Sequence, residues 1–458
     1  MAGAETRLER GLGLKEATAL NMIDMVGIGP FVTASIVLSQ MNGPQALAAW
    51  VTGAVLSLLD GCIWAELGAA MPQAGGSYVF LREAYGPARW GRLMSFLFIW
   101  QTMVQAPLVM ASAAIGFGEY LTYYWPLDPL AERAVRGGLI IFLVFLLYRR
   151  VTTVGKISLL IWVGVVATML VLIGGGLANF DAQLAFAFPP GAWTLSWAFF
   201  AGLGAATVKT MYTYLGYYNV CHLGGEIRAP ERNIPRSIFI SILGIAALYL
   251  AMQTSILGVV PWQEAKQSKY LVSLFVERIF GPAAAQVATA MILWIACGSL
   301  FSLTLGYSRI PYAAALDGNF FSVFGRVHPT KHFPHISLLA LGATALVFSV
   351  LFRLGEVISA ILAMRILVQF VGGAVGLVLL RRRWPPERFP FRMWLYPWPV
   401  VLMIAGWLAV FLSTGSIAVG GTAIPLPLAG LGMMILGTVV FLIRARVQNE
   451  WPFAEAGP

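Results

Sequence analysis

Charged residues are scarce in this sequence. Asp, Glu, Lys and Arg make up 11% of the 458 residues, whereas soluble domains contain about 25%. Hydrophobic residues make up 59% of the chain, and its mean hydropathy is +0.78. The apolar runs are roughly 20 residues long, the length that a helix needs to cross about 30 Å of hydrocarbon. This composition excludes an ordinary soluble domain and predicts an all-α integral membrane protein.

Cysteine is also rare, and no catalytic or metal-binding pattern stands out. Cys62, Cys221 and Cys297 all fall inside apolar runs, so they indicate neither a disulfide framework nor a metal-ligand spacing. The chain shows no nucleophile–base pair, phosphate-binding loop or cluster of metal ligands. We therefore expect neither an enzyme nor a bound cofactor. Residues 1–15 are polar and the first apolar run follows directly, so we expect no cleavable signal peptide.

Twelve apolar stretches are present, and we predict that each is a transmembrane helix. Residues 1–16 would form an N-terminal segment, residues 17–380 a ten-helix core, and residues 381–458 a loop, helices 11 and 12 and a C-terminal tail. The twelve predicted spans are 17–40, 45–70, 92–121, 134–149, 154–178, 196–222, 234–258, 283–312, 336–353, 356–380, 395–414 and 424–444.

The basic residues indicate how these spans are oriented. Of the 30 Lys and Arg residues, 22 fall on the same side as the N-terminus, six on the opposite side and two within spans. Basic residues concentrate on the cytoplasmic side of membrane proteins. We therefore expect a multi-pass protein of the cell membrane with both termini cytoplasmic. The net charge of +10 then reflects contact with anionic lipid headgroups of the bilayer rather than with nucleic acid.

Two of the predicted spans are interrupted by residues that do not suit a continuous helix. The first contains N-M-I-D-M-V-G-I-G-P-F-V at residues 21–32, and the sixth contains Y-T-Y-L-G-Y-Y-N at residues 212–219. Interrupted spans at matching positions of two halves are typical of transporters built from inverted repeats. We predict two such repeats of five helices, at about residues 17–178 and 196–380.

The interruptions have a direct chemical use. Unwound backbone is tolerated within a membrane only where it is buried in protein or lines a cavity. The start of one half-helix then offers free N–H groups, and the end of the other offers free carbonyls. Pro30 suits the first turn of the second half-helix, because its missing N–H is not needed there. Such a pair of half-helices can bind the carboxylate and the ammonium group of a zwitterion.

Several segments resemble the amino acid–polyamine–organocation (APC) superfamily of permeases. They are G-I-G-P-F (27–31), W-A-E-L-G-A-A-M-P-Q-A-G-G-S-Y-V-F-L-R-E-A-Y-G (64–86) and E-I-R-A-P-E-R-N-I-P-R-S-I (226–238). R-R-R-W-P-P-E-R-F-P-F-R-M-W-L-Y-P (381–397) is similar to the family's loop after span ten. The resemblance covers nearly the whole chain in order. It implies a LeuT-type fold of twelve helices, with helices 1 and 6 broken, that transports amino acids or related amines.

The resemblance also implies which residues hold the substrate. The family's carboxylate-binding G-S-G corresponds to residues 27–29, and the carbonyls of residues 25 and 26 would face the amino group. The span-six pattern F-A-Y-G-G-W-N corresponds to residues 212–218, and the aromatic residue at its first position would close over the substrate. The asparagine at the end of the pattern is not matched, because Asn219 lies one residue later in this sequence. The implied substrate-binding residues are Met25, Val26, Gly27, Ile28, Gly29, Tyr212, Thr213, Tyr214 and Gly216.

Two ionisable residues lie close to the interruptions. Asp24 precedes Gly27 by one turn, and an ionisable residue within a span marks a functional site by default. Burial favours the protonated form of a carboxylic acid, so Asp24 can serve as a proton site, as a counter-charge for a cationic substrate or as a hydrogen-bonded structural residue. Lys209 precedes Tyr212 by one turn and can pair with Asp24, neutralise an anionic substrate group or extend toward the outer surface.

Other polar residues within the spans favour structural interpretations. Arg365 can contact the pocket or pair with a carboxylate such as Glu356 or Asp60, and we favour the pair because lone buried charges are costly. Glu66 would pair with an arginine of an inner loop. Hydroxyl groups at span centres more often join helices than bind sodium. The hydroxyl residues concerned are Ser299, Ser302 and Thr304, and the histidines expected to be solvated at helix ends are His222, His328, His332 and His335.

These observations predict a secondary transporter of amino acids that works by alternating access. We expect coupling to protons, with Asp24 as the leading carrier, rather than to sodium. A polyamine or cationic amine transporter is the nearest alternative, because an acidic residue before the first interruption can hold an ammonium group. A membrane sensor that binds its ligand without moving it is a third interpretation, and the lack of a signalling domain in the sequence counts against it.

Overall fold

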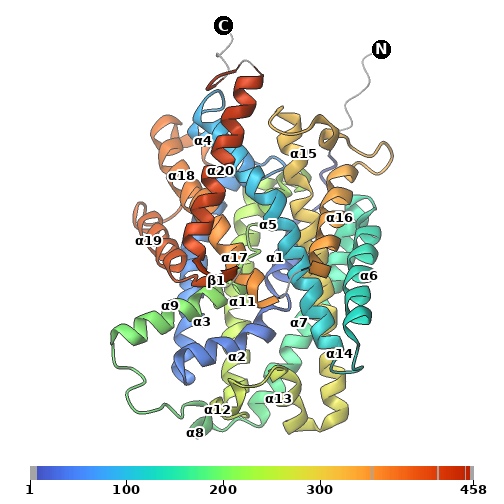
Figure 1. The fold of residues 1–458 in the computed structure, drawn as a ribbon, viewed down its shortest axis with the longest axis vertical. Helices are drawn as coiled ribbons and strands as arrows, with labels where there is room; N and C mark the ends of the chain where they lie inside the picture. Colours follow the sequence, from blue (N-terminus) through green and yellow to red (C-terminus); the bar gives the residue numbers. More distant parts are fainter. Residues whose placement is uncertain (1–7, 352–353, 420–421, 449, 454–458) are drawn as a thin grey trace.

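The structure is a computed structural model that describes residues 8–351, 354–419, 422–448 and 450–453. It is a bundle of helices, most of which run roughly along its longest axis (Figure 1). The first elements are α1 (Leu14–Met25), α2 (Gly29–Met41), the 3₁₀ helix η1 (Pro44–Ala46), α3 (Leu47–Ala70), α4 (Ser77–Tyr85), α5 (Trp90–Leu121), α6 (Pro129–Leu147), α7 (Val151–Ala178) and α8 (Ala182–Ala185).

The second part of the chain continues the bundle. It contains α9 (Trp197–Tyr214), α10 (Asn219–His222), the 3₁₀ helix η2 (Gly224–Glu226), α11 (Pro230–Leu257), α12 (Trp262–Ala265), α13 (Leu271–Phe280), α14 (Pro282–Tyr307), α15 (Arg309–Leu316), the 3₁₀ helix η3 (Ser322–Gly325) and α16 (His335–Leu351).

The last part contains one π-helical segment and a short hairpin. The elements are α17 (Leu354–Arg365), the π-helix η4 (Ile366–Val371), α18 (Gly372–Arg383), the 3₁₀ helix η5 (Pro386–Arg388), α19 (Trp398–Leu412), β1 (Ser416–Val419), β2 (Thr422–Pro425) and α20 (Leu426–Val447). The two strands pair antiparallel, with Ser416 opposite Pro425.

Several helices are long and apolar enough to cross a membrane. Within the described ranges there are seven of them, or eight if the bent pair of α1 and α2 counts as one span. The most hydrophobic 18-residue windows of α5 and of α14–α15 are 67% buried, whereas that of α20 is 22% buried. The first two therefore lie inside the bundle, and α20 lies at its edge. The chain is a multi-pass membrane protein.

The first helix break lies between α1 and α2. Helix α1 ends at Met25, α2 begins at Gly29, and the two axes meet at 43°. Pro30 occupies the first turn of α2, where its missing N–H leaves no acceptor unsatisfied. The structure leaves little space for a side chain at Gly27 or Gly29. A Cβ atom at Gly27 would lie 2.6 Å from the Ser299 Oγ, and a Cβ atom at Gly29 would lie 3.0 Å from the Thr213 Cγ2.

The second helix break lies between α9 and α10. Helix α9 ends at Tyr214, residues 215–218 form a turn, and α10 begins at Asn219. Gly216 has a φ of +126°, which residues with a side chain rarely adopt. Its Cα packs against the first break, because a Cβ atom there would lie 2.8 Å from the Met25 nitrogen and 2.9 Å from the Asp24 carbonyl carbon. The two breaks therefore touch through Gly216.

The ends of the bundle carry shorter elements. Helices α4 and α15 and the C-terminal end of α20 lie at one end, and α8, α12 and α13 lie at the other (Figure 1). Residues 71–86 contain α4, and this helix packs against α5 and α18. The segment between α11 and α14 contains two short helices, α12 and α13, which the non-helical residues 266–270 separate.

Candidate functional site

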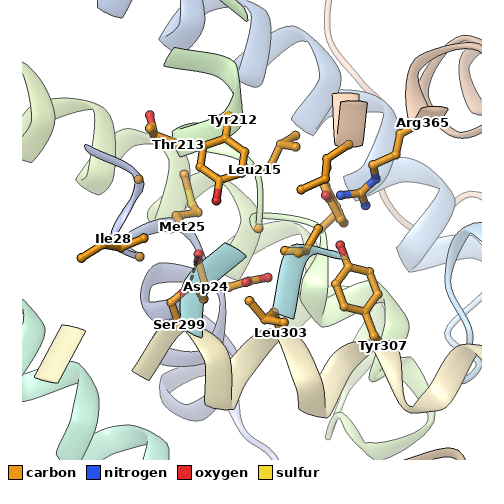
Figure 2. Close-up of a pocket in the computed structure, with 17 residues that line it drawn as sticks. Asp24, Met25, Ile28, Tyr212, Thr213, Leu215, Ser299, Leu303, Tyr307 and Arg365 are labelled. Atoms are coloured by element: carbon orange, nitrogen blue, oxygen red, sulfur yellow. Dashed lines mark hydrogen bonds between the residues drawn. The ribbon is translucent and has the colours of Figure 1, made fainter. Parts of the chain in front are cut away.

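A cavity of about 50 Å³ lies between the two helix breaks (Figure 2). It is small compared with the roughly 300–1,000 Å³ of typical small-molecule sites. In this conformation, side chains that line the cavity therefore have to move before a ligand can enter it. The lining residues are Asp24, Met25, Gly27, Ile28, Gly29, Val109, Ala113, Tyr212, Thr213, Leu215, Gly216, Tyr218, Ser299, Leu303, Tyr307, Ile361 and Arg365.

The first break presents hydrogen-bond donors to this cavity. The N–H groups of Ile28 and Gly29, at the start of α2, make no hydrogen bond within the described part of the chain. Free N–H groups at the start of a helix attract negative charge. This position suits the carboxylate of a ligand.

The hydrogen-bond acceptors at the first break differ from the expected ones, which were the carbonyls of residues 25 and 26. The carbonyl oxygen of Met25 already accepts from the Tyr249 hydroxyl at 2.7 Å and from the Gly27 N–H at 3.0 Å. Val26 is buried and does not line the cavity. The Asp24 side chain does line it, and Figure 2 shows this side chain directed into the space between the two breaks. Asp24 is therefore better placed than the Met25 carbonyl to meet an ammonium group.

The second break supplies one wall and an aromatic ring. Tyr212, Thr213 and Gly216 line the cavity, whereas Tyr214 points elsewhere and donates to the Trp50 carbonyl at 3.2 Å. The Tyr212 hydroxyl lies 3.0 Å from the Ser112 Oγ on α5. A Cβ atom at Gly29 would lie 3.2 Å from the Tyr212 ring, so this ring covers the start of α2. Tyr212 thus contacts both α5 and the start of α2 while lining the cavity.

Lys209 does not pair with Asp24. Its Nζ donates to the Ser359 Oγ at 2.7 Å, and the residue does not line the cavity. The sequence placed Lys209 on the same helix face as Tyr212, but a helical face does not show which neighbouring helix a long side chain will reach.

Arg365 has a more prominent place than the sequence indicated. It lines the cavity and is 3% exposed, and its Nε donates to the Gln369 Oε1 at 2.9 Å. Its guanidinium lies 5.2 Å from the centre of the Tyr218 ring and 5.7 Å from that of Tyr307. It forms no ion pair within the described part of the chain, and the side chain of Glu356, one expected partner, lies outside the described residues.

Asp60, the other expected partner of Arg365, belongs to a buried network behind the second break. Its Oδ2 accepts from the Trp64 Nε1 at 2.9 Å and from the Tyr217 hydroxyl. The Trp64 ring in turn stacks on Tyr218, with centroids 4.7 Å apart. Asp60 and Trp64 of α3 therefore contact two consecutive residues of the second break, Tyr217 and Tyr218. The signal for this network was an aspartate one helical turn before a tryptophan within an apolar run.

The hydroxyl groups of α14 support the backbone of α1. The Ser302 Oγ donates to the Leu20 carbonyl at 2.7 Å, and Ser299 Oγ lies 3.4 Å from the Asp24 carbonyl. The Thr304 Oγ1 donates within its own helix, to the Leu300 carbonyl at 2.6 Å. The described residues contain no group of three or more His, Cys, Asp or Glu that could hold a metal ion. Ser299 and Ser302 thus join α14 to α1, and two hydroxyl-bearing residues of α14, Ser299 and Tyr307, line the cavity.

The Asn219 side chain strengthens the same junction. Its Nδ2 donates to the carbonyl of Ser302 at 3.1 Å and to the Ser302 Oγ at 3.0 Å. Asn219 lies one residue later than the asparagine of the family pattern, and its hydrogen bonds join α10 to α14.

The expectation of a solvated His222 was wrong. This residue is 1% exposed and contacts the rings of Trp64, Tyr218 and Tyr307. Its Nδ1 lies 3.4 Å from the Gly75 carbonyl. It is buried because residues 71–76 fold back beside α10, where Ala74 and Leu223 form an antiparallel bridge. The sequence placed His222 at the end of a span but did not show this covering segment.

A buried ion pair joins the segment after α10 to the start of α15. Arg309 donates to both carboxylate oxygens of Glu226, at 2.7 and 2.8 Å, and the two side chains are 2% and 0% exposed. Leu12 pairs by backbone hydrogen bonds with the segment around Ile227. These contacts join the start of α1, the segment after α10 and the start of α15.

Glu66 pairs with Arg381 at 2.6 Å. Arg381 lies just beyond the tenth predicted span, where the sequence predicted the arginine partner of Glu66.

Comparison with known proteins connects this geometry to a family. The family model described as amino acid permease matches residues 12–441. The serine/threonine exchanger SteT of Bacillus subtilis (strain 168) is 25% identical over 89% of this chain and 91% of its own length. Mouse (Mus musculus) cationic amino acid transporter 4 is 28% identical over 82% of this chain, which spans 60% of that relative. The crystal structure of MhsT in complex with L-phenylalanine has the same fold, with a TM-score of 0.63 and 12% identity, and the match covers 89% of this chain and 99% of that one.

Proposed function

The chain belongs to the amino acid permease family, and we propose that it moves amino acids across the cell membrane by alternating access. It is an APC-superfamily permease with a LeuT-type fold, and it is a transporter rather than an enzyme. The observation that carries the proposal is the cavity between the two helix breaks, with free N–H groups on one side and a carboxylate beside them.

We extend the proposal to the arrangement in the membrane. Twelve spans form a core of two inverted repeats of five, at about residues 17–178 and 196–380, followed by spans 11 and 12. Both termini are cytoplasmic. The excess of basic residues on that side supports this orientation. The helix breaks between α1 and α2 and between α9 and α10 support this scheme, because each falls in the first span of a proposed repeat.

The cavity suggests how an amino acid is held. The α-carboxylate accepts hydrogen bonds from the N–H groups of Ile28 and Gly29. The α-ammonium group faces the Asp24 carboxylate, since the Met25 carbonyl is already used by Tyr249. The substrate side chain then extends toward Tyr307 and Arg365 (Figure 2). Tyr212 covers the bound molecule and has to move for entry and release.

Coupling to protons is the second part of the proposal, with Asp24 as the carrier. The Asp24 side chain lines the cavity within the membrane-spanning bundle, and ionisable residues in such positions mark proton pathways in transporters. Proteoliposomes with and without an inward proton gradient test this assignment. We expect the gradient to accelerate uptake by the wild-type protein and to have no effect on Asp24→Asn. Equal uptake by the wild-type protein with and without the gradient would reject coupling to protons.

Transport of a polyamine or cationic amine is the alternative that the structure allows. Asp24 can hold an ammonium group of such a molecule as well as that of an amino acid. Arg365 weighs against it, because this guanidinium lines the same cavity and repels a polycation that lacks an anionic group. Competition of labelled amino acid uptake by putrescine and spermidine separates the two functions. Competition by these amines that exceeds competition by every amino acid would favour the alternative.

A further inference from the structure

An amphipathic groove that shares none of its lining residues with the transport cavity lies at the edge of the bundle. It has a volume of about 580 Å³ and lies between one face of α5, one face of α20 and the segment that follows α15. This volume is within the roughly 300–1,000 Å³ of typical ligand sites. The α5 face contributes Phe96, Ile99, Trp100 and Met103, which follow the spacing of neighbours along one side of a helix.

The apolar part of the groove faces the hydrocarbon region. Helix α20 is mostly exposed, and Val440 on its inner face lines the groove. Phe96 stacks beside Trp100 with centroids 6.4 Å apart, and Phe320 closes the groove from the segment after α15. An acyl chain can therefore lie in this part of the groove without leaving the membrane.

The polar part lies at the end of α20, which the proposed topology places at the cytoplasmic surface. Arg444, Gln448 and Ser322 line the groove there. Arg444 donates from Nη1 to the Asn319 carbonyl at 2.7 Å, from Nη2 to the Gly318 carbonyl at 2.5 Å and from Nε to the Gln448 Oε1 at 3.1 Å. A guanidinium has five N–H donors, so two remain for a ligand.

The charge of Arg444 is not neutralised by the carboxylates near the groove. Asp317 pairs with Arg82, and Glu450 pairs with Arg92 at 2.7 Å. Within the described residues, Arg444 itself has neutral hydrogen-bond acceptors and no ion pair. An anionic group with an apolar tail would match both parts of the groove.

We propose that this groove binds an anionic phospholipid of the cytoplasmic leaflet, with its phosphate at Arg444 and an acyl chain between α5 and α20. A bound lipid would hold α20 against α5, a helix that also contributes Ser112 and Ala113 next to the transport cavity. The site does not depend on which amino acid the protein carries.

Native mass spectrometry of the protein released from nanodiscs of equal parts phosphatidylglycerol and phosphatidylcholine tests the proposal. One basic residue near a membrane surface contributes about 1 kcal/mol, so we expect the wild-type protein to retain phosphatidylglycerol about fivefold in excess. Arg444→Gln should abolish this preference. Arg446→Gln is the matched control, because it removes an equal charge from an exposed position on the same helix end and should leave the preference intact.

A second pair of variants tests the apolar part of the groove. Val440→Trp fills it and should abolish retention of both lipids, whereas Val439→Trp, on the exposed face of α20, should not. Circular dichroism and uptake measurements establish that each variant is folded. Equal retention of the two lipids by the wild-type protein, or unchanged retention by Val440→Trp, would overturn the proposal. A second copy of the chain bound in place of lipid, and lost in Val440→Trp, would also overturn it.

Discussion

The two helix breaks line the same cavity but are built in different ways. The first is three residues long, contains Gly27, and leaves the N–H groups of Ile28 and Gly29 free. The second is four residues long and is fixed by buried side chains, since Tyr217 donates to Asp60 and Tyr218 stacks on Trp64. We propose that the first break supplies ligand contacts and that the second supplies a rigid support.

The largest effect is expected where the two breaks touch. In Gly216→Ala, the Cβ atom would lie 2.8 Å from the Met25 nitrogen, and a φ of +126° is unfavourable for alanine. Overpacking costs about 1–3 kcal/mol and the backbone strain about 1–3 kcal/mol, so uptake should fall about 100-fold or more. Gly281→Ala is the matched control, because Gly281 has a φ of +83° and no atom within 4 Å of an added Cβ. Similar loss of uptake in both variants would show that contact between the breaks is unimportant.

The support of the second break should be next in importance. Asp60→Asn removes the charge that accepts hydrogen bonds from Trp64 and Tyr217. A hydrogen bond to a charged group contributes about 1.5–3 kcal/mol, so the Tm should fall and the KM for uptake should rise about tenfold. Tyr217→Phe removes one of the two donors and should have a smaller effect. A normal Tm and KM in Asp60→Asn would contradict the role of this network.

The link from Tyr249 to the first break should have a moderate effect. The Tyr249 hydroxyl donates to the Met25 carbonyl at 2.7 Å and also lies 3.1 Å from the Thr213 carbonyl, so it contacts both breaks. Tyr249→Phe removes a hydrogen bond that contributes about 0.5–1.5 kcal/mol, and we expect substrate affinity to fall about fivefold. Ser299→Ala removes a longer contact, of 3.4 Å, to the Asp24 carbonyl and should change affinity about twofold or less. The reverse order in equilibrium binding would contradict the assigned geometry.

Local sequence signals were enough to locate the breaks and much of the cavity. Gly27 and Pro30 stand out in an apolar run because a continuous membrane helix rarely places them together, and the structure ends α1 two residues before Gly27. Asp24, seven of the nine implied substrate-binding residues and several of their neighbours line the cavity. Val26, Tyr214 and Lys209 do not, and their directions depend on the helices packed beside them.

Contacts between distant residues were beyond the reach of the sequence. Tyr249 lies 224 residues from Met25, and no local pattern shows that its hydroxyl occupies the Met25 carbonyl. The burial of His222 depends on a segment around Gly75. Arg365 could be recognised as an arginine within a span, but its position in the cavity follows from the packing of α17 against α5 and α9. These features require the three-dimensional arrangement of several helices.

The central claim is that the first break binds the carboxylate of an amino acid beside Asp24. The most direct test is equilibrium binding of the transported amino acid, its decarboxylated amine and its methyl ester to the purified protein. Each loss of a charge-assisted contact should cost about 1.5–3 kcal/mol, so we predict that the amine and the ester bind about 10- to 100-fold more weakly than the amino acid. Equal binding of the amino acid and its decarboxylated amine would contradict the account.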